Sequence, residues 1–223
     1  MARPKAGYKT KDGKKVPGTT TIISRFKDSG GLLWWAFEQG KSAERGEINS
    51  LYDKRDEAAD AGTLAHEMVE AHIKGFPEPD MAKHYEKVVI LARQGFENYL
   101  RWAENNRIKI VQQETPLVSE LYQFGGTLDA IGIDAQNNLC LLDWKNANAI
   151  YVDYLLQIAS YNQLWLENYP GKPLIGGFHL CRFSKEHADF AHHYWSELDT
   201  AWEQFKLFRL AYDLDKLLKK RTG

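Results

Sequence analysis

The feature that most constrains the fold is a pair of short apolar segments separated by a polar turn. The segments run from Thr127 to Ile133 and from Leu139 to Trp144, and the five residues between them are all polar or small. Apolar runs of this length on either side of a polar turn are typical of a β-hairpin. The sequence therefore predicts two antiparallel strands here, within a sheet that other segments must complete.

Three charged residues lie within this hairpin: Asp129 in the first strand, and Asp143 and Lys145 at the end of the second. Side chains alternate between the faces of a strand, so Asp143 and Lys145 project to one side, and antiparallel pairing can bring Asp129 there too. Two carboxylates held together need a positive group between them, and hard divalent cations prefer oxygen ligands. The pattern predicts a Mg²⁺ or Mn²⁺ site with Lys145 placed to orient or deprotonate water. For an isolated D-x-K sequence, a solvated salt bridge is the alternative.

Two predicted helices carry further polar side chains. Residues 151–169 form an amphipathic segment that ends at a Pro-Gly pair, and on it Gln157 and Tyr161 lie four apart on one face. Residues 53–74 predict a second helix, which carries His66. The sequence H-E-M-V-E is not the H-E-x-x-H zinc signature, so His66 taken alone is a core or surface histidine.

The remaining periodic segments complete a predicted mixed α/β fold, a central sheet flanked by helices. Helices are predicted at 30–47, 84–105 and 198–220, and strands at 108–121, 174–183 and 190–195. The strand at 108–121 contains Glu114, for which an edge-strand surface charge is the simple interpretation.

Four short motifs resemble, in their order, the PD-(D/E)XK nuclease superfamily and its RecB-like exonuclease branch. They are G-x-x-x-H ending at His66, G-x-x-D ending at Asp129, D-x-K from Asp143 to Lys145, and Q-x-x-x-Y from Gln157 to Tyr161. Leu128 stands where the superfamily name has proline, a substitution common in this branch. The relatives include the mitochondrial genome maintenance exonuclease and phage exonucleases.

The resemblance implies a restriction-endonuclease-like core and a set of site residues. It assigns the divalent ion, Mg²⁺ or Mn²⁺, to His66, Asp129, Asp143 and the backbone carbonyl of Trp144. It makes Glu114 a further ligand or water partner and Lys145 the residue that positions water. It also places Gln157 and Tyr161 near the site, where they can hydrogen-bond a phosphate or hold Lys145.

The activity implied is metal-dependent hydrolysis of phosphodiester bonds in DNA, by an exonuclease rather than an endonuclease, in replication, recombination or repair. The expected partners are single-stranded DNA or duplex ends, together with recombination or replication proteins. The residues leave open an endonuclease, a phosphohydrolase of small nucleotides, and a non-catalytic DNA-binding module that keeps the fold. No helix-turn-helix or zinc pattern suggests a transcription-related DNA reader. The oligomeric state is not predicted.

The N-terminal region offers candidate contacts to DNA. Residues 1–15 are basic and turn-rich, as expected of a solvated tail, a hairpin or a phosphate-contacting arm. Residues 16–26 suit a strand or a helix N-terminus, in which a threonine would serve as N-cap. Adjacent helical residues diverge by about 100°, so one tryptophan of the pair at 34–35 can be free to stack on bases. The candidates are Thr19, Thr20, Thr21, Trp34 and Trp35.

Length and composition allow one domain over residues 1–223, with the basic segment 1–15 and a helical addition at about 16–105. The net charge of −1 gives no global basic field, so DNA binding would depend on local patches and metal-bridged phosphates. Cys140 and Cys181 are too few for a disulfide scaffold or a four-cysteine iron–sulfur cluster. No membrane span or signal peptide is recognisable, so we expect a cytoplasmic protein, bacterial or phage-encoded.

Overall fold

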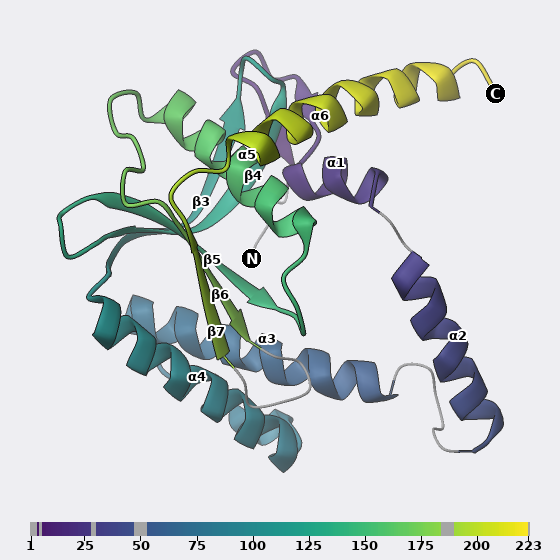
Figure 1. The fold of residues 1–223 in the computed structure, drawn as a ribbon, viewed down its shortest axis with the longest axis vertical. Coiled ribbons are helices and arrows are strands. Elements are labelled where there is room, and N and C mark those ends of the chain that lie inside the picture. Colours follow the sequence, from purple (N-terminus) through teal and green to yellow (C-terminus); the bar gives the residue numbers. More distant parts are fainter. Residues whose placement is uncertain (1–3, 5, 28–29, 47–52, 184–189, 223) are drawn as a thin grey trace.

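A five-stranded mixed sheet with helices on both faces forms the centre of the protein (Figure 1). The computed structural model describes all residues except 1–3, 5, 28–29, 47–52, 184–189 and 223; the side chains at 31, 32, 35 and 53–60 also lie outside the described part. The predicted mixed α/β class is confirmed.

The strands follow one another across the sheet in the order β3-β4-β5-β6-β7. Their bounds are β3 Lys109–Ser119, β4 Phe124–Ile133, β5 Leu139–Asn146, β6 Phe178–Phe183 and β7 Phe190–Trp195. Neighbours pair antiparallel except β5 and β6, which are parallel. A parallel pair needs a crossover connection, and helix α5 (Val152–Asn168) supplies it.

The turn between β4 and β5 is held by the side chain of Asp134. Its Oδ1 accepts hydrogen bonds from the backbone N–H groups of Gln136, at 2.9 Å, and Asn138, at 2.8 Å. Asn137 adopts a left-handed conformation with φ of 64°, which asparagine tolerates better than most residues. The predicted hairpin is therefore formed by local turn chemistry, and its register pairs Ala130 with Leu142.

Each face of the sheet is covered by its own group of helices. Helices α1 (Thr19–Arg25), α5 and α6 (Asp199–Lys219) pack on one face, and α3 (Asp53–Lys74) and α4 (Glu86–Asn106) on the other (Figure 1). Side chains buried on the α5 face include Phe124, Ile131, Leu141, Ile158, Leu164 and Phe205. Those on the α3 face include Leu64, Met68, Val88, Tyr99, Leu142 and Trp144.

The N-terminal part forms a two-stranded hairpin and two helices before α3. Strands β1 (Tyr8–Lys9) and β2 (Lys15–Val16) pair antiparallel, and α1 follows them directly. Helix α2 (Gly30–Glu44) extends away from the sheet in Figure 1. A short 3₁₀ helix, Met81–Lys83, lies between α3 and α4. The subdivision into a basic segment, a helical addition and a core stays a prediction.

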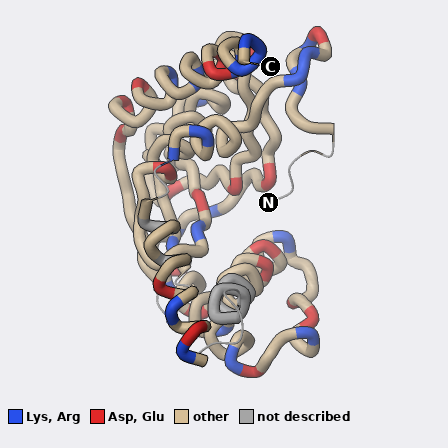
Figure 2. Tube along the Cα trace, turned by 90° about the vertical axis from the view of Figure 1, so that its right-hand side faces the viewer, with Lys and Arg blue, Asp and Glu red and all other residues tan. Residues whose placement is uncertain are grey.

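Positions of both charge signs are interspersed along the chain trace in Figure 2. This distribution agrees with the net charge of −1. An anionic partner would therefore meet local basic groups rather than one uniformly basic face. Among the described helices, none combines the length and apolar character needed to cross a membrane.

Candidate metal and hydrolytic site

Asp129 and Asp143 lie beside each other on β4 and β5. The register pairs Ala130 with Leu142, so the next residue on each strand brings the two aspartates opposite one another. Both are buried, with 2% and 0% of their surface exposed. Both face α5, because their charges act on the hydroxyl of its Tyr161. Two carboxylates are thus held together inside the protein.

The oxygens of these carboxylates have few hydrogen-bond donors. Oδ2 of Asp129 accepts a hydrogen bond from the backbone N–H of Trp144 at 2.9 Å. Oδ1 of Asp129 and both oxygens of Asp143 are buried and accept no hydrogen bond from the described part of the chain, although Lys145 forms an ion pair with Asp143. Buried polar atoms normally have partners, and exceptions mark sites completed by an ion or water. The pair therefore has oxygen atoms available to a cation.

Burial raises the pKa of both aspartates. For Asp143 the pKa is raised to about 7: burial is the main cause, the ammonium of Lys145 opposes it, and the charge of Asp129 adds to it. For Asp129, burial again dominates, with opposing effects from Lys145 and the Trp144 N–H and a further rise from Glu114. A low-dielectric environment disfavours two adjacent negative charges. Near neutral pH the pair therefore resists full ionisation unless positive charge is added.

Lys145 is held between a carboxylate and an aromatic ring. Its ammonium pairs with Asp143 and lies 5.4 Å from the ring centre of Tyr154 on α5. A cation over an aromatic face is stabilised by the ring quadrupole. The sequence reasoning did not include Tyr154, although its position one turn before Gln157 on the same helical face could have indicated it.

Gln157 and Tyr161 form the α5 wall of the site. The side-chain amide of Gln157 donates to the hydroxyl of Tyr161 at 2.7 Å, and both residues are buried. The pKa of Tyr161 is raised well above its ordinary value, first by burial and then by the charges of Asp129 and Asp143. The hydroxyl therefore stays protonated and can act as a hydrogen-bond donor.

Close packing of β4 against α5 depends on Gly126. A Cβ atom at this position would lie 2.6 Å from Cε1 of Tyr161 and 2.9 Å from Cδ1 of Leu164. Contacts this short do not occur between real side chains. The absence of a side chain at Gly126 therefore lets Tyr161 approach the strand that carries Asp129.

Glu114 lies on β3 in a strained conformation. Its neighbours Gln113 and Thr115 pair with Ala130 and Leu128 on β4, so Glu114 lies opposite Asp129. The backbone angle φ of Glu114 is 48°. A left-handed conformation costs a non-glycine residue roughly 1–2 kcal/mol. Glu114 is half-buried on an edge strand, and its charge contributes to the raised pKa of Asp129. The structure thus brings Glu114 near the aspartates, and its role as a ligand stays a prediction.

His66 lies on α3, on the other side of the sheet, near enough for the charges of Lys145 and Asp143 to act on it. Burial lowers its pKa, as does the nearby charge of Lys145, while Glu70 and Asp143 act in the opposite direction. The imidazole is therefore neutral at physiological pH, the form that binds metals. Within the described residues, no group of three or more His, Cys, Asp and Glu side chains is arranged to hold a metal ion. Ligation by His66 and by the Trp144 carbonyl remains a prediction.

Gly62, one turn before His66, allows α3 to approach the end of β5. A Cβ here would overlap the side-chain amide of Asn146, with distances of 1.9 to 2.1 Å. We expect Gly62→Ala to lower the free energy of unfolding by about 1–3 kcal/mol, because either the helix or Asn146 must move. Urea denaturation followed by circular dichroism measures this change.

The matched control is Gly40→Ala on α2, where a Cβ would meet no atom within 4 Å. There the exchange should leave stability unchanged or raise it by up to about 1 kcal/mol, the difference in helix propensity. Equal effects of the two variants would show that α3 does not depend on close approach at Gly62.

The three threonines of α1 occupy different environments. Thr19 is buried; its hydroxyl donates to the carbonyl of Gly125 at 3.3 Å and contacts the hydroxyl of Ser160 at 3.2 Å. Thr20 is exposed, and Thr21 is half-buried at an open pocket. Gly18, rather than a threonine, is the N-cap of α1, so the predicted capping role is wrong. The hydroxyl of Thr19 is hydrogen-bonded inside the protein, where it connects α1 to β4 and α5, so it does not face solvent.

Of the two candidate tryptophans, Trp34 is exposed on α2, as are Leu33 and Phe37. The side chain of Trp35 lies outside the described residues. Base stacking by either residue stays a prediction, and the structure does not bring them into contact with the aspartate pair.

Tyr8 is a neighbour of the site that sequence reasoning missed. Its hydroxyl is hydrogen-bonded to that of Thr127 at 2.9 Å, two residues before Asp129. Its ring packs over Gly125, where a Cβ would lie 2.4 Å from Cγ of the ring. The residues joined are 119 positions apart, and no local pattern signals such a contact.

No protein-family model matches the sequence, and no curated protein sequence matches it. Among solved structures, the chain is similar to a crystal structure from Eubacterium rectale of a protein named provisionally as an exonuclease. The TM-score is 0.45 at 13% sequence identity, and the match covers 66% of this chain and 64% of that chain, less than two thirds of its length. This similarity concerns the fold alone, so any functional argument must come from the site.

Proposed function

We propose that the chain is a metal-dependent nuclease that hydrolyses phosphodiester bonds in DNA. The observation that carries the proposal is the buried pair Asp129 and Asp143, three of whose four oxygens accept no hydrogen bond within the described part of the chain, beside the buried ammonium of Lys145, which forms an ion pair with Asp143. Burying two carboxylates side by side destabilises the folded state unless positive charge compensates them. The pair suits a site that binds a cation and a charged substrate.

The donor set fits a hard divalent cation. Asp129 and Asp143 would hold Mg²⁺ or Mn²⁺ through the oxygens that accept no hydrogen bond, with the Trp144 carbonyl and His66 as further ligands. When bound, the cation would supply positive charge that polarises the phosphate and lowers the pKa of a water molecule. The two buried negative charges would then be compensated.

The remaining side chains have roles that follow from their positions. Lys145 would orient the attacking water through its ammonium, which lies at the carboxylate pair. To take up the proton of that water, Lys145 would first have to release its own proton to solvent and act as the neutral amine. Gln157 and the protonated Tyr161 would donate to a phosphate oxygen. Water oxygen forms the new bond to phosphorus, the bridging P–O bond breaks, and the leaving oxygen takes a proton.

Digestion of end-labelled linear DNA with Mg²⁺ or Mn²⁺ tests the proposal, with Lys145→Ala as the diagnostic variant. Loss of a residue that positions or deprotonates water should lower the cleavage rate about 10²- to 10⁴-fold. Lys83→Ala is the matched control, since Lys83 is 76% exposed and paired only with Asp80 among the interactions described for it. Its rate should equal that of the wild type.

The choice of substrates distinguishes the alternatives. Cleavage of linear single strands or duplex ends, but not of a covalently closed circle, would identify an exonuclease acting in replication, recombination or repair. Cutting of the circle would identify an endonuclease. Hydrolysis of nucleotides alone would identify a phosphohydrolase, and binding of DNA without cleavage a non-catalytic module. Equal rates for Lys145→Ala and wild type would contradict the assignment of the site.

A further inference from the structure

Helix α6 carries apolar side chains on two opposite faces. One face packs against the core through Phe205, which is fully buried, and through Trp202, Phe208 and Tyr212. The other face is exposed and rich in leucine. Its members, each between 51% and 65% exposed, are Leu207, Leu210, Leu214, Leu217 and Leu218. We call this exposed set of five leucines the leucine stripe. A surface helix packs on a protein core through one apolar face, so a second exposed apolar face indicates a binding surface for another molecule.

The spacing of the leucine stripe is that of a coiled coil. Leu207, Leu210, Leu214 and Leu217 follow each other at intervals of three, four and three residues. These are the intervals of the a and d positions of a heptad, which form the seam between two helices. Thr200 and Glu203 continue the same seam toward the start of the helix, and both are exposed. The whole length of α6 can therefore be covered by one partner helix.

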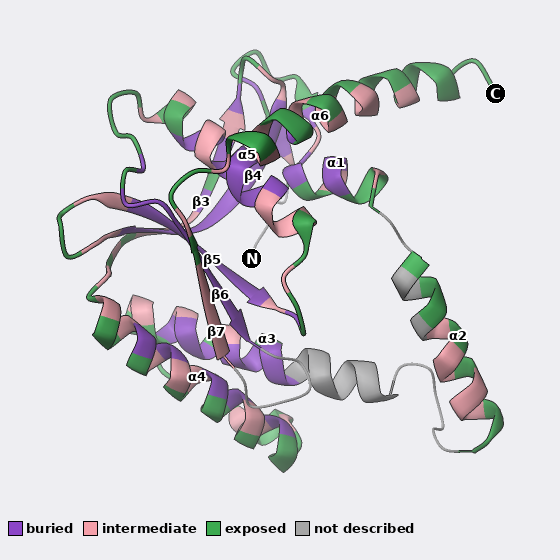
Figure 3. Ribbon diagram, in the orientation of Figure 1, coloured by how far each residue is buried: buried purple, intermediate pink, exposed green. Residues whose placement is uncertain are grey.

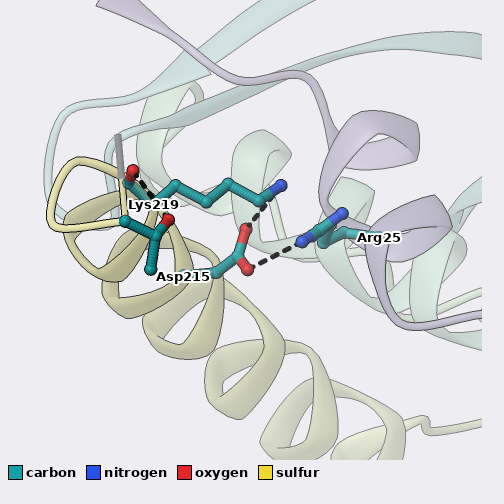
Figure 4. A network of polar contacts seen from close by, with 4 residues as sticks. Arg25, Asp215 and Lys219 are labelled. Carbon is teal, nitrogen blue, oxygen red and sulfur yellow. Dashed lines mark hydrogen bonds and ion pairs between the residues drawn. The ribbon is translucent and has the colours of Figure 1, made fainter.

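Contacts with α1 fix the orientation of α6. Arg25 pairs with Asp215 at 2.7 Å, and Lys219 pairs with the other oxygen of Asp215 at 3.3 Å (Figure 4). The rings of Phe26 and Phe208 are 5.1 Å apart. These contacts hold the inner side of α6 against α1, and Figure 3 shows exposed residues along the outer side. The leucine stripe therefore faces away from the body of the protein.

One edge of the leucine stripe carries charges that alternate in sign at intervals of seven residues. They are Asp199, Lys206, Asp213 and Lys220. Residues at this spacing occupy the g position of each heptad, where charges set partner choice and orientation. Read in the opposite direction, the row has opposite signs at every position. It is therefore complementary to a second copy of itself that runs antiparallel.

We propose that the leucine stripe binds the same helix of a second copy of this chain, in an antiparallel pair related by a twofold axis. Asp199 would then face Lys220 of the second copy, and Lys206 would face Asp213. In this register Leu207 packs against Leu210 of the second copy at the centre of the interface, and toward its two ends Leu214 lies beside Glu203 and Leu217 beside Thr200 of the second copy. The interface is isologous, as in most homodimers.

Other arrangements lose the charge complementarity. A shift by one heptad pairs the leucines with one another, Leu207 with Leu217 and Leu210 with Leu214, but it places Asp213 against Asp213 and Lys206 against Lys220, which are repulsive contacts. In that register Lys206→Asp would strengthen the dimer, so this variant distinguishes the two registers. A parallel pair places Lys206 beside Ala211 and Asp213 beside Leu218, so no charge is matched. The ion pair Lys206–Glu203 within one chain does not prevent exchange, because pairs of this exposure contribute only about 0–1 kcal/mol. In the pair Arg209–Asp213 the arginine is largely buried and also donates to the carbonyls of Tyr122 and Gln123, while Asp213 is 56% exposed and can accept a second cation from the partner helix.

Sedimentation of the purified protein over a range of micromolar concentrations tests this inference. The wild type should be a dimer, and Leu210→Ser should dissociate it while leaving the monomer folded, because Leu210 is exposed. Lys206→Asp should weaken the dimer by about tenfold or more, since the new aspartate faces Asp213 of the second copy and the twofold axis repeats this repulsive pair. Adding Asp213→Lys to Lys206→Asp restores opposite charges in this register and should recover most of the affinity.

The matched control is Leu121→Ser, an exposed leucine between β3 and β4 that should leave the dimer unchanged. A wild type that is monomeric at every concentration would overturn the proposal. A dimer whose dissociation constant is unchanged by Leu210→Ser would also overturn it. The same holds if the double variant Lys206→Asp with Asp213→Lys dimerises no more tightly than Lys206→Asp alone. Because no DNA or metal is present, the result does not depend on the proposed nuclease activity.

Discussion

Replacing Asp143 with asparagine is expected to reduce metal-dependent cleavage of DNA by at least about 10³-fold, because the reaction loses the charge that holds and balances the cation. The amide has nearly the same shape as the carboxyl group, so the β4–β5 hairpin should remain folded. At pH 8 two opposing contributions determine its free energy of unfolding: the buried ammonium of Lys145 loses its ion pair, which destabilises the variant, and a buried carboxylate that is disfavoured beside Asp129 is removed, which stabilises it. Cleavage rates with Mn²⁺ and urea denaturation measure the two effects.

The control for this variant is Asp134→Asn, the same chemical change at the other end of the same hairpin. Asp134 holds the turn through hydrogen bonds that its Oδ1 accepts from backbone N–H groups, and an asparagine oxygen can accept them too. Its cleavage rate should be that of the wild type. If Asp143→Asn also cleaved DNA at the wild-type rate, the aspartate pair would not be the hydrolytic site.

The parts of the fold that the sequence predicted are those specified by local chemistry. The β4–β5 hairpin follows from two apolar runs and a turn that Asp134 closes by itself. The end of α5 follows from Pro170 and from Gly171, whose φ of 82° no helix can continue. The convergence of Asp129, Asp143 and Lys145 follows from the alternation of side chains along paired strands.

The remaining features depend on contacts between distant segments. Tyr8 reaches Thr127 because the N-terminal hairpin packs over a glycine in β4, and nothing near Tyr8 in sequence signals this. The inward orientation of Thr19 likewise depends on Ser160 of α5. The positive φ of Glu114 is imposed by the surrounding sheet against the residue's own preference. Such features are set by tertiary structure, so a periodic pattern does not reveal them.

Helix α6 illustrates a different limit. The periodicity of the sequence predicts an amphipathic helix. Because the helix has apolar residues on two faces, the sequence does not indicate which face packs on the core. The structure shows that Phe205 faces inward and Leu210 outward. The distinction between core and interface therefore needs the orientation of the helix. The charges on its edge become informative only after that orientation is known.

In protein stripped of divalent cations, the free energy of unfolding of the wild type, relative to that of the double variant Asp129→Asn with Asp143→Asn, is expected to fall as the pH rises from about 4 to about 7. The comparison with the variant is needed because burial lowers the pKa of His66, His179 and His192, and these histidines make both proteins more stable as the pH rises through the same range. The pKa of Asp143 is 3.8 in the unfolded chain and is raised to about 7 in the fold, chiefly by burial. Between these values the folded state keeps a proton that the unfolded state has released. Stability is therefore lost as the pH rises through this window, by at most about 4 kcal/mol, and levels off above it.

Added Mg²⁺ or Mn²⁺ should reverse this loss, because a cation replaces the proton between the carboxylates and binds more tightly as the proton leaves. Thermal unfolding should show a larger stabilisation by metal at pH 8 than at pH 5, about 3 kcal/mol when the cation is at 100 times its Kd. The double variant Asp129→Asn with Asp143→Asn should lose the response to metal and keep only the pH dependence that comes from the buried histidines, whereas Asp134→Asn should behave like the wild type in both respects. A metal response of equal size in the double variant would place the cation elsewhere. A wild type whose stability relative to the double variant does not fall between pH 4 and pH 7 would show instead that Lys145 outweighs burial and keeps the pair ionised.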